Sequence, residues 1–190
     1  MNENKIQNEK INKNLSTINH VIAILSGKGG VGKSTVATNI ALTLADQGYQ
    51  VGLLDSDFHG PTIPTMLGLK SKRITQTSEE LQPIQATENL KVLSMGFLIP
   101  SNDDAIIWRG PMKMSAIKQF LGDFHWGSLD YLIIDLPPGT GDEPLSIAQL
   151  IPTLSGAIIV TTPQDVALVS VRKSISFIKK LAPIVCAESS

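Results

Sequence analysis

Five short, nearly continuous apolar runs are spaced along the chain from residue 21 onward. They lack the strict alternation of polar and apolar positions that marks a strand with one face in water. Continuous runs of this length are typical of strands covered on both faces, and a parallel sheet needs such covering. We therefore predict buried strands at Val21–Leu25, Gln50–Leu54, Leu90–Ser94, Tyr131–Ile134 and Gly156–Val160.

The segments between these runs have the spacing of helices. Ser34–Gln47 carries an apolar residue at every fourth position and is followed by Gly48, a common residue just past a helix end. Pro111–Leu121 and Val166–Leu181 look similar. Strands that alternate with helices predict an α/β fold with a doubly wound, mainly parallel sheet.

Two segments interrupt this rhythm. Residues 1–19 are rich in Asn, Lys and Glu with few apolar residues, so we predict a polar N-terminal arm that is disordered or a frayed helix. The folded domain would then cover residues 20–190. Residues 70–89 are also polar and predict a surface excursion between two strands.

Charge and composition exclude several classes of protein. The net charge is −1, from 16 Lys and Arg against 17 Asp and Glu, which argues against binding nucleic acid or an anionic membrane through bulk charge. No apolar run approaches the roughly 18 residues of a membrane-spanning helix. The first residues lack a signal-peptide core, and one cysteine cannot form an intramolecular disulfide. We expect a cytoplasmic protein with no membrane or nucleic-acid partner.

The most specific motif follows the first predicted strand and opens the first long helix. Residues 27–35 match the phosphate-binding pattern G-x-x-x-x-G-K-[ST] in full. Glycines let backbone N–H groups turn onto phosphate oxygens, and the helix N-terminus adds the positive end of its dipole. We expect Lys33 to contact the β- and γ-phosphates and Ser34 to coordinate Mg²⁺. The predicted ATP-binding residues here are Gly27, Lys28, Gly29, Gly30, Val31, Gly32, Lys33, Ser34 and Thr35.

A second motif follows the fourth predicted strand. The strand ends in Asp135, which fits a Walker B carboxylate that helps to hold Mg²⁺, because α/β sheets bind ligands at the carboxyl ends of parallel strands. The turn-rich Pro-Pro-Gly-Thr-Gly segment that follows can bring Gly139 near a γ-phosphate and change conformation on hydrolysis. A structural capping role for Asp135 stays open.

The second predicted strand is also followed by acids, Asp55 and Asp57. Two carboxylates beside a triphosphate would repel it unless they hold metal or water, so their place indicates a catalytic task. We expect Asp55 to support the Mg²⁺ site or to cap the strand end. The alternative is that both residues merely cap the next helix.

The phosphate loop contains a second lysine, Lys28, that the general pattern does not require. The sequence KGGVGKST resembles the deviant Walker A motif of the MinD, ParA, ArsA and Mrp superfamily of P-loop ATPases. This resemblance implies an ATP-bound homodimer in which Lys28 reaches the partner's ATP, and it implies that Asp57 orients the attacking water. Lys28, Lys33 and Asp57 are thus the expected catalytic residues, although a solvated loop lysine remains an alternative for Lys28.

Further stretches narrow the resemblance to the Mrp/ApbC group, ATPases that carry and deliver iron–sulfur clusters. The similarity extends from about residue 18 to about residue 180, and it implies slow ATP hydrolysis and transfer of clusters to apo-proteins. The stretches are Asp57–Pro64, Met95–Phe97, Trp108–Met112, Asp135–Asp142 and Thr161–Ala167.

The sequence departs from this group at its end. Family members continue with an adenine-contact segment and a Cys-x-x-Cys pair that binds a [4Fe–4S] cluster across the dimer, whereas the only cysteine here is Cys186, so no iron–sulfur ligand is present. We therefore expect a truncated member that lacks its last strands and helices. The rival interpretations are a MinD/ParA-type positioning ATPase and a truncated, non-catalytic partner of a full-length homologue.

Overall fold

The computed structural model describes residues 3–58, 60–74, 76–77, 80–98, 110–139, 141–151, 154–163, 172–176 and 178–179. Side chains are described for these residues apart from 3, 76, 77, 80 and 98. The strands are β1 (Ile18–Leu25), β2 (Val51–Asp55), β3 (Gln76–Thr77), β4 (Glu80–Leu81), β5 (Ile84–Thr87), β6 (Leu90–Ser94), β7 (Leu129–Asp135) and β8 (Gly156–Ile159). The helices are α1 (Glu3–Leu15), α2 (Lys33–Asp46), α3 (Ile63–Met66), the 3₁₀ helix η1 (Met95–Leu98), α4 (Gly110–Gly122) and α5 (Asp142–Gln149).

Six strands form one sheet in the order β5-β6-β2-β7-β1-β8. All neighbours are parallel except β5, which pairs antiparallel with β6. The five predicted strands are these five parallel ones, with ends that differ by a few residues. The α/β class and the mainly parallel sheet are therefore confirmed.

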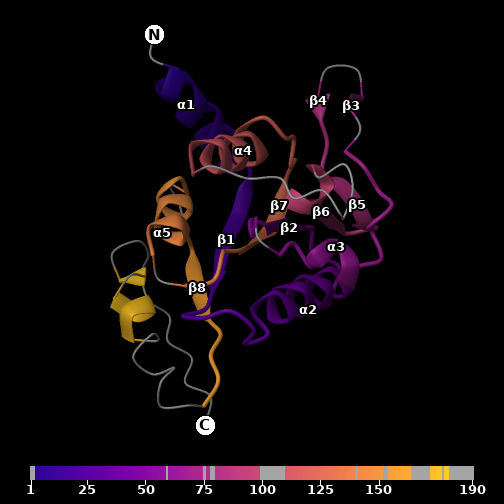
Figure 1. Cartoon of the computed structure of the whole chain (residues 1–190). Coiled ribbons are helices and arrows are strands. Elements are labelled where there is room, and N and C mark those ends of the chain that lie inside the picture. Colours follow the sequence, from indigo (N-terminus) through magenta and orange to yellow (C-terminus); the bar gives the residue numbers. More distant parts are fainter. Residues whose placement is uncertain are drawn as a thin grey trace.

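Helices cover both faces of the sheet, so its strands are buried as their continuous apolar runs require (Figure 1). One face carries α2 and α3. The small residues Ala37, Ala41 and Ala45 of α2 allow this helix to pack closely on the sheet. The other face carries α1, α4 and α5, with larger residues such as Phe120 and Ile147 in the core. None of the helices in the described part of the chain is long and apolar enough to cross a bilayer.

The N-terminal segment differs from the solvated arm that we expected. Residues 3–15 form α1, which lies along α4, and its Ile11 and Leu15 are each only 1% exposed. The Asn14 side-chain amide donates to two backbone carbonyls, that of Leu121 at 2.7 Å and that of Phe124 at 2.6 Å. A sparse apolar stripe was enough for docking because polar side chains of α1 cap the end of α4.

The polar segment 70–89 contains more regular structure than the surface excursion that we predicted. It includes the short β3–β4 pair and the edge strand β5. The third predicted helix, residues 166–181, is helical at 172–176, and most of its other residues lie outside the described part. Trp108 and Cys186 also lie outside it, as does most of Thr161–Ala167.

The topology opens a crevice between β1 and β7. From β1 the chain crosses one face through α2 to β2, and from β7 it crosses the opposite face through α5 to β8. The connections thus leave two adjacent strands in opposite directions, which is the switch point where open α/β sheets bind ligands.

Candidate functional site

The phosphate loop spans the turn from β1 to α2. Gly30 and Gly32 have φ values of 77° and 87°, a left-handed conformation that strongly favours glycine. Gly32 is the residue before the first turn of α2, so the loop delivers its backbone N–H groups to a helix N-terminus. The local sequence therefore fixes the backbone shape that phosphate binding needs.

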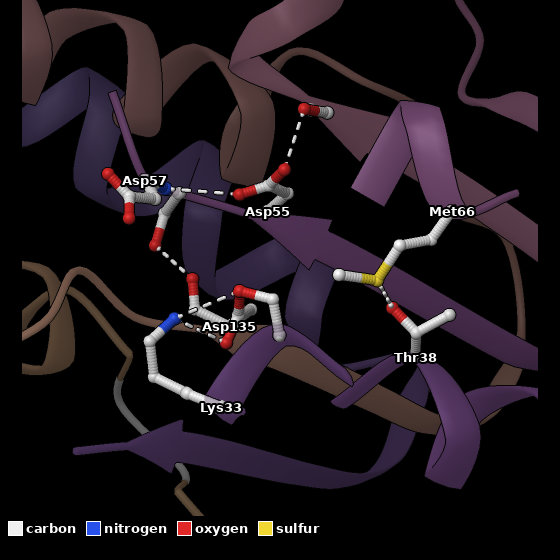
Figure 2. Close-up of polar contacts among 9 residues, drawn as sticks. Lys33, Thr38, Asp55, Asp57, Met66 and Asp135 are labelled. Carbon is white, nitrogen blue, oxygen red and sulfur yellow. Dashed lines mark hydrogen bonds and ion pairs between the residues drawn. The ribbon is translucent and has the colours of Figure 1, made fainter. Parts of the chain in front are cut away.

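Lys33 and Ser34 converge on Asp135 at the end of β7 (Figure 2). The Lys33 Nζ donates to Asp135 Oδ1 at 2.6 Å, and the Ser34 hydroxyl donates to Asp135 Oδ2 at 2.6 Å. Asp135 is fully buried and the Lys33 side chain is 7% exposed. Burial raises the pKa of Asp135 above its usual value, while Lys33 and Ser34 act in the opposite direction.

Asp55 ends β2 directly beside Asp135 in the sheet register. It is 1% exposed, accepts a hydrogen bond from the Ser94 hydroxyl at 2.9 Å, and accepts another from the backbone N–H of Asp57 at 3.2 Å (Figure 2). Burial, helped by the charge of Asp135, raises the pKa of Asp55 to about 7. From the end of β2, Asp55 therefore holds the backbone of Asp57 in place through this hydrogen bond.

The turn after β7 is fastened to the end of β1. The backbone N–H of Gly139 donates to the carbonyl of Ser26 at 2.8 Å, and Gly139 has a φ of 102°. The Ser56 N–H and hydroxyl both donate to the carbonyl of Asp135, at 3.1 and 2.7 Å. The three strand ends β1, β2 and β7 are thus connected by hydrogen bonds.

A cleft of about 240 Å³ lies above these strand ends, and Asp57 is in its lining with the phosphate loop. The Ser26 hydroxyl in the lining is buried without a hydrogen-bond partner among the described residues, as expected at a site for a polar ligand. A serine hydroxyl beside a carboxylate offers the hard oxygen donors that Mg²⁺ prefers. The full lining is Ser26, Gly29, Gly30, Gly32, Lys33, Ser34, Thr35, Asp57, Gly60, Thr62, Met66 and Pro138.

The structure brings the predicted residues together at one edge of the sheet. The loop residues 27–35, Asp55, Asp57, Asp135 and Gly139 all lie there, and Lys28 is exposed on the loop. Their chemical roles remain predictions. Within the described residues, no group of three or more His, Cys, Asp and Glu side chains is placed to hold a metal ion.

The sequence interpretation missed several residues of this region. Ser94 ends β6 at the same edge and could have been found as a polar residue that closes an apolar strand. Thr62, just before α3, and Met66 of α3 also line the cleft. Thr62 falls within the Asp57–Pro64 stretch but was given no role, and Met66 carries no motif. Met66 also accepts a hydrogen bond on its sulfur from the Thr38 hydroxyl of α2, at 3.7 Å.

Curated proteins with established names resemble the chain over most of its length. An iron-sulfur cluster carrier protein of Saccharolobus solfataricus is 51% identical over 168 residues, which is 88% of this chain and 57% of that protein. A cytosolic Fe-S cluster assembly factor Nubp2 homolog of Anopheles gambiae is 52% identical over 170 residues, 87% of this chain and 66% of that protein. The chain thus spans less than two thirds of the length of these relatives.

A solved structure agrees with the fold. The nucleotide-binding protein of Archaeoglobus fulgidus, in complex with ADP, is 42% identical, with a TM-score of 0.79 over 92% of this chain and 67% of that chain. The family model described as ParA, NUBPL iron-transfer P-loop NTPase matches residues 17–187. The glycine loop, the strand-end acids and these similarities lead to one conclusion: the chain belongs to the NUBPL iron-transfer family of ParA-like P-loop NTPases.

Proposed function

We propose that this protein binds ATP with Mg²⁺ in the cleft, hydrolyses it slowly to ADP and phosphate as a homodimer, and takes part in iron–sulfur cluster assembly. The convergence of Lys33 and Ser34 on Asp135 beside the glycine loop carries the nucleotide part. The names of the two relatives, a cluster carrier and a cytosolic cluster assembly factor, support the cluster part. Delivery of clusters to apo-proteins in the cytoplasm belongs to the same proposal.

ATP binding would replace Asp135, the partner of Lys33, by the phosphates of the nucleotide. In the structure, Lys33 is paired with the buried Asp135. A triphosphate in the cleft offers Lys33 more negative charge, so its ammonium would turn to the β- and γ-phosphates. Ser34 and Asp135 would then hold Mg²⁺, which would supply positive charge to offset the charge of the triphosphate.

Hydrolysis needs a water molecule aligned with the γ-phosphate. Asp57 lines the cleft, and its backbone N–H is held by Asp55. Its carboxylate would orient that water and accept its proton. The water oxygen forms a bond to the γ-phosphorus while the bond to the bridging oxygen breaks, and ADP leaves with that electron pair. Lys28, exposed on the loop, would contribute its charge to the nucleotide of the partner subunit.

Two variants test the nucleotide part. Asp57→Ala should bind ATP with nearly unchanged affinity and lose turnover by about 10²-fold or more, because only the water is affected. Lys33→Ala should lose ATP binding itself. Phosphate release and equilibrium binding are measured on the same preparations, and unchanged turnover in Asp57→Ala would remove its role.

The cluster part concerns the whole protein, because the chain spans 57% and 66% of the two relatives. The test is transfer of a [4Fe–4S] cluster from the reconstituted whole protein to an apo-enzyme that needs one, with and without ATP. We expect recovery of the acceptor's activity, with a rate that depends on nucleotide. Recovery no faster than with free iron and sulfide would contradict delivery.

A further inference from the structure

The first turn of α4 contains a buried lysine. Lys113 is 8% exposed, although the positive end of a helix dipole disfavours a cation there. Burying an ammonium group is also expensive unless it is paired. The surroundings of Lys113 must therefore compensate for both penalties.

Two groups from different segments compensate for this charge. The Lys113 Nζ donates to both carboxylate oxygens of Glu143, at 3.0 and 3.2 Å, in the first turn of α5. The same Nζ lies 5.4 Å from the centre of the Phe58 ring, within the range of a cation–π contact. Phe58 is itself buried, so little water competes with that contact.

Each of these partners is linked to one acid of the nucleotide site. Phe58 is the residue after Asp57, so its ring anchors the segment that leaves β2. Glu143 stands two residues after Gly141, at the end of the turn that begins at Asp135 and includes Gly139. One ammonium group thus contacts the segment after β2, from which Asp57 lines the cleft, and the segment after β7, from which Pro138 lines it.

α4 itself is held firmly from the other end. The bond from Asn14 to the carbonyl of Leu121 and the 2.9 Å bond from the Trp126 indole to the carbonyl of Phe120 fix its C-terminal part. The second bond from Asn14 holds the chain just after the helix, at Phe124.

Gly122 allows close packing on α1, because an added Cβ would lie 3.1 Å from Ile11 Cγ1. α1 lies against α4 (Figure 1). The position of α4, and with it the backbone of Lys113, is therefore fixed by its neighbours.

A purely structural need would be met without a charge. Apolar residues in place of both Lys113 and Glu143 would fill the same space and avoid the desolvation of an ammonium group, and replacing a whole ion pair in this way is often neutral for stability. What lysine adds is a directed link to a carboxylate and to an aromatic ring at once.

We propose that Lys113 is a positioning residue that ties the Asp57 segment and the β7–α5 turn to α4, so that both keep the geometry required for hydrolysis. This inference rests on the proposed ATP hydrolysis. Lys113 acts through Phe58 and Glu143 and does not touch the nucleotide in this account.

The test compares Lys113→Met with three other variants of the 190-residue chain. Lys113→Arg keeps the charge, Glu143→Gln removes only the carboxylate partner, and Lys118→Met is the control, because Lys118 lies on the same helix with an exposed contact to Asn4. Steady-state hydrolysis gives kcat and KM for ATP. Amide hydrogen exchange without nucleotide reports the segment after β2, the β7–α5 turn and the phosphate loop separately.

We expect Lys113→Met to lower kcat by about 10- to 100-fold while KM changes by less than about threefold, because misplaced groups affect the reacting geometry more than binding. Amide exchange should rise in both tied segments and stay unchanged in the phosphate loop. Glu143→Gln should show a smaller loss of kcat, Lys113→Arg should recover most of it, and Lys118→Met should match the parent chain.

Equal kcat in Lys113→Met and the parent would overturn the inference, as would a loss that Lys113→Arg does not recover. Should Lys113→Met not fold, the kcat of Glu143→Gln is compared with that of Lys118→Met instead. Equal kcat in these two variants would overturn the inference. Should the parent chain itself show no turnover, the proposed hydrolysis fails, and the exchange measurement alone decides. Unchanged exchange in either tied segment would then refute the link.

Discussion

The pairs Lys33–Asp135 and Lys10–Asp123 both connect distant parts of the described chain, and they differ in their access to water. Lys33 and Asp135 meet at 2.6 Å with side chains 7% and 0% exposed, whereas Lys10 and Asp123 meet at 2.9 Å with side chains 54% and 26% exposed. Water screens the second pair, so it contributes little to stability. The first pair keeps charge in the interior, at the edge of the sheet where the cleft lies.

The difference shows how the two regions use polar groups. Between α1 and α4 they satisfy helix ends and fix a docking geometry, as the Asn14 bonds do. At the ends of β2 and β7 the acids Asp55 and Asp135 are buried side by side, at the expense of raised pKa values. Such an arrangement is typical of a functional site.

The largest effect is expected when the buried pair is broken. Lys33→Met should lower the free energy of unfolding of the nucleotide-free protein by about 3 kcal/mol or more at pH 8, because Asp135 would be left as an unpaired buried charge. Urea unfolding of the two proteins measures this difference. A loss below about 1 kcal/mol would mean that the pair contributes no more than a surface pair.

The next effect is a pH dependence from Asp55. Its pKa is about 7 in the folded protein against 3.8 in the unfolded chain, so between these values only the folded state keeps the proton. The free energy of unfolding therefore falls as pH rises across this window, by up to about 1.4 kcal/mol per pH unit. Asp55→Asn should remove that part of the slope and leave the protein more stable than the parent at pH 8. Parallel profiles of unfolding free energy for Asp55→Asn and the parent from pH 5 to pH 8 would contradict this prediction.

A smaller loss is expected at the α1–α4 contact. Asn14→Ala should destabilise the protein by about 1–2 kcal/mol, because two carbonyls at the end of α4 lose their donor. Thermal unfolding measures it, with Asn12→Ala as the control, since Asn12 is exposed on the same helix. Equal melting of the two variants would mean that α1 does not depend on these bonds.

The smallest effect belongs to the exposed pair. Lys10→Met should change the free energy of unfolding by less than about 1 kcal/mol, and the difference should vanish in high salt. The same urea experiment measures it beside Lys33→Met. A loss as large as that of Lys33→Met would break the comparison between the two regions.

The strands and the phosphate loop could be predicted because their signals are local. A continuous apolar run such as Tyr131–Ile134 identifies a buried strand, and the nine residues 27–35 contain the whole phosphate motif. The meeting of Asp55 with Asp135 also followed, because acids at the ends of parallel strands gather at one edge.

The remaining features depend on contacts between segments far apart in sequence. Asn14 lies on a helix with few apolar residues, and its partners are 107 and 110 residues away. Lys113 looks like an ordinary lysine of an amphipathic helix until Glu143 and Phe58 are placed beside it. Nothing in the local pattern of either residue indicates such partners.

The central claim is that the cleft at the ends of β1, β2 and β7 binds a nucleoside triphosphate. Isothermal titration of the chain with ATP and Mg²⁺ tests it most directly, beside the same titration of Lys33→Ala. We predict saturable binding of one nucleotide per chain, and a loss of binding in Lys33→Ala. The absence of binding to the parent chain, or equal affinity in both proteins, would contradict the account.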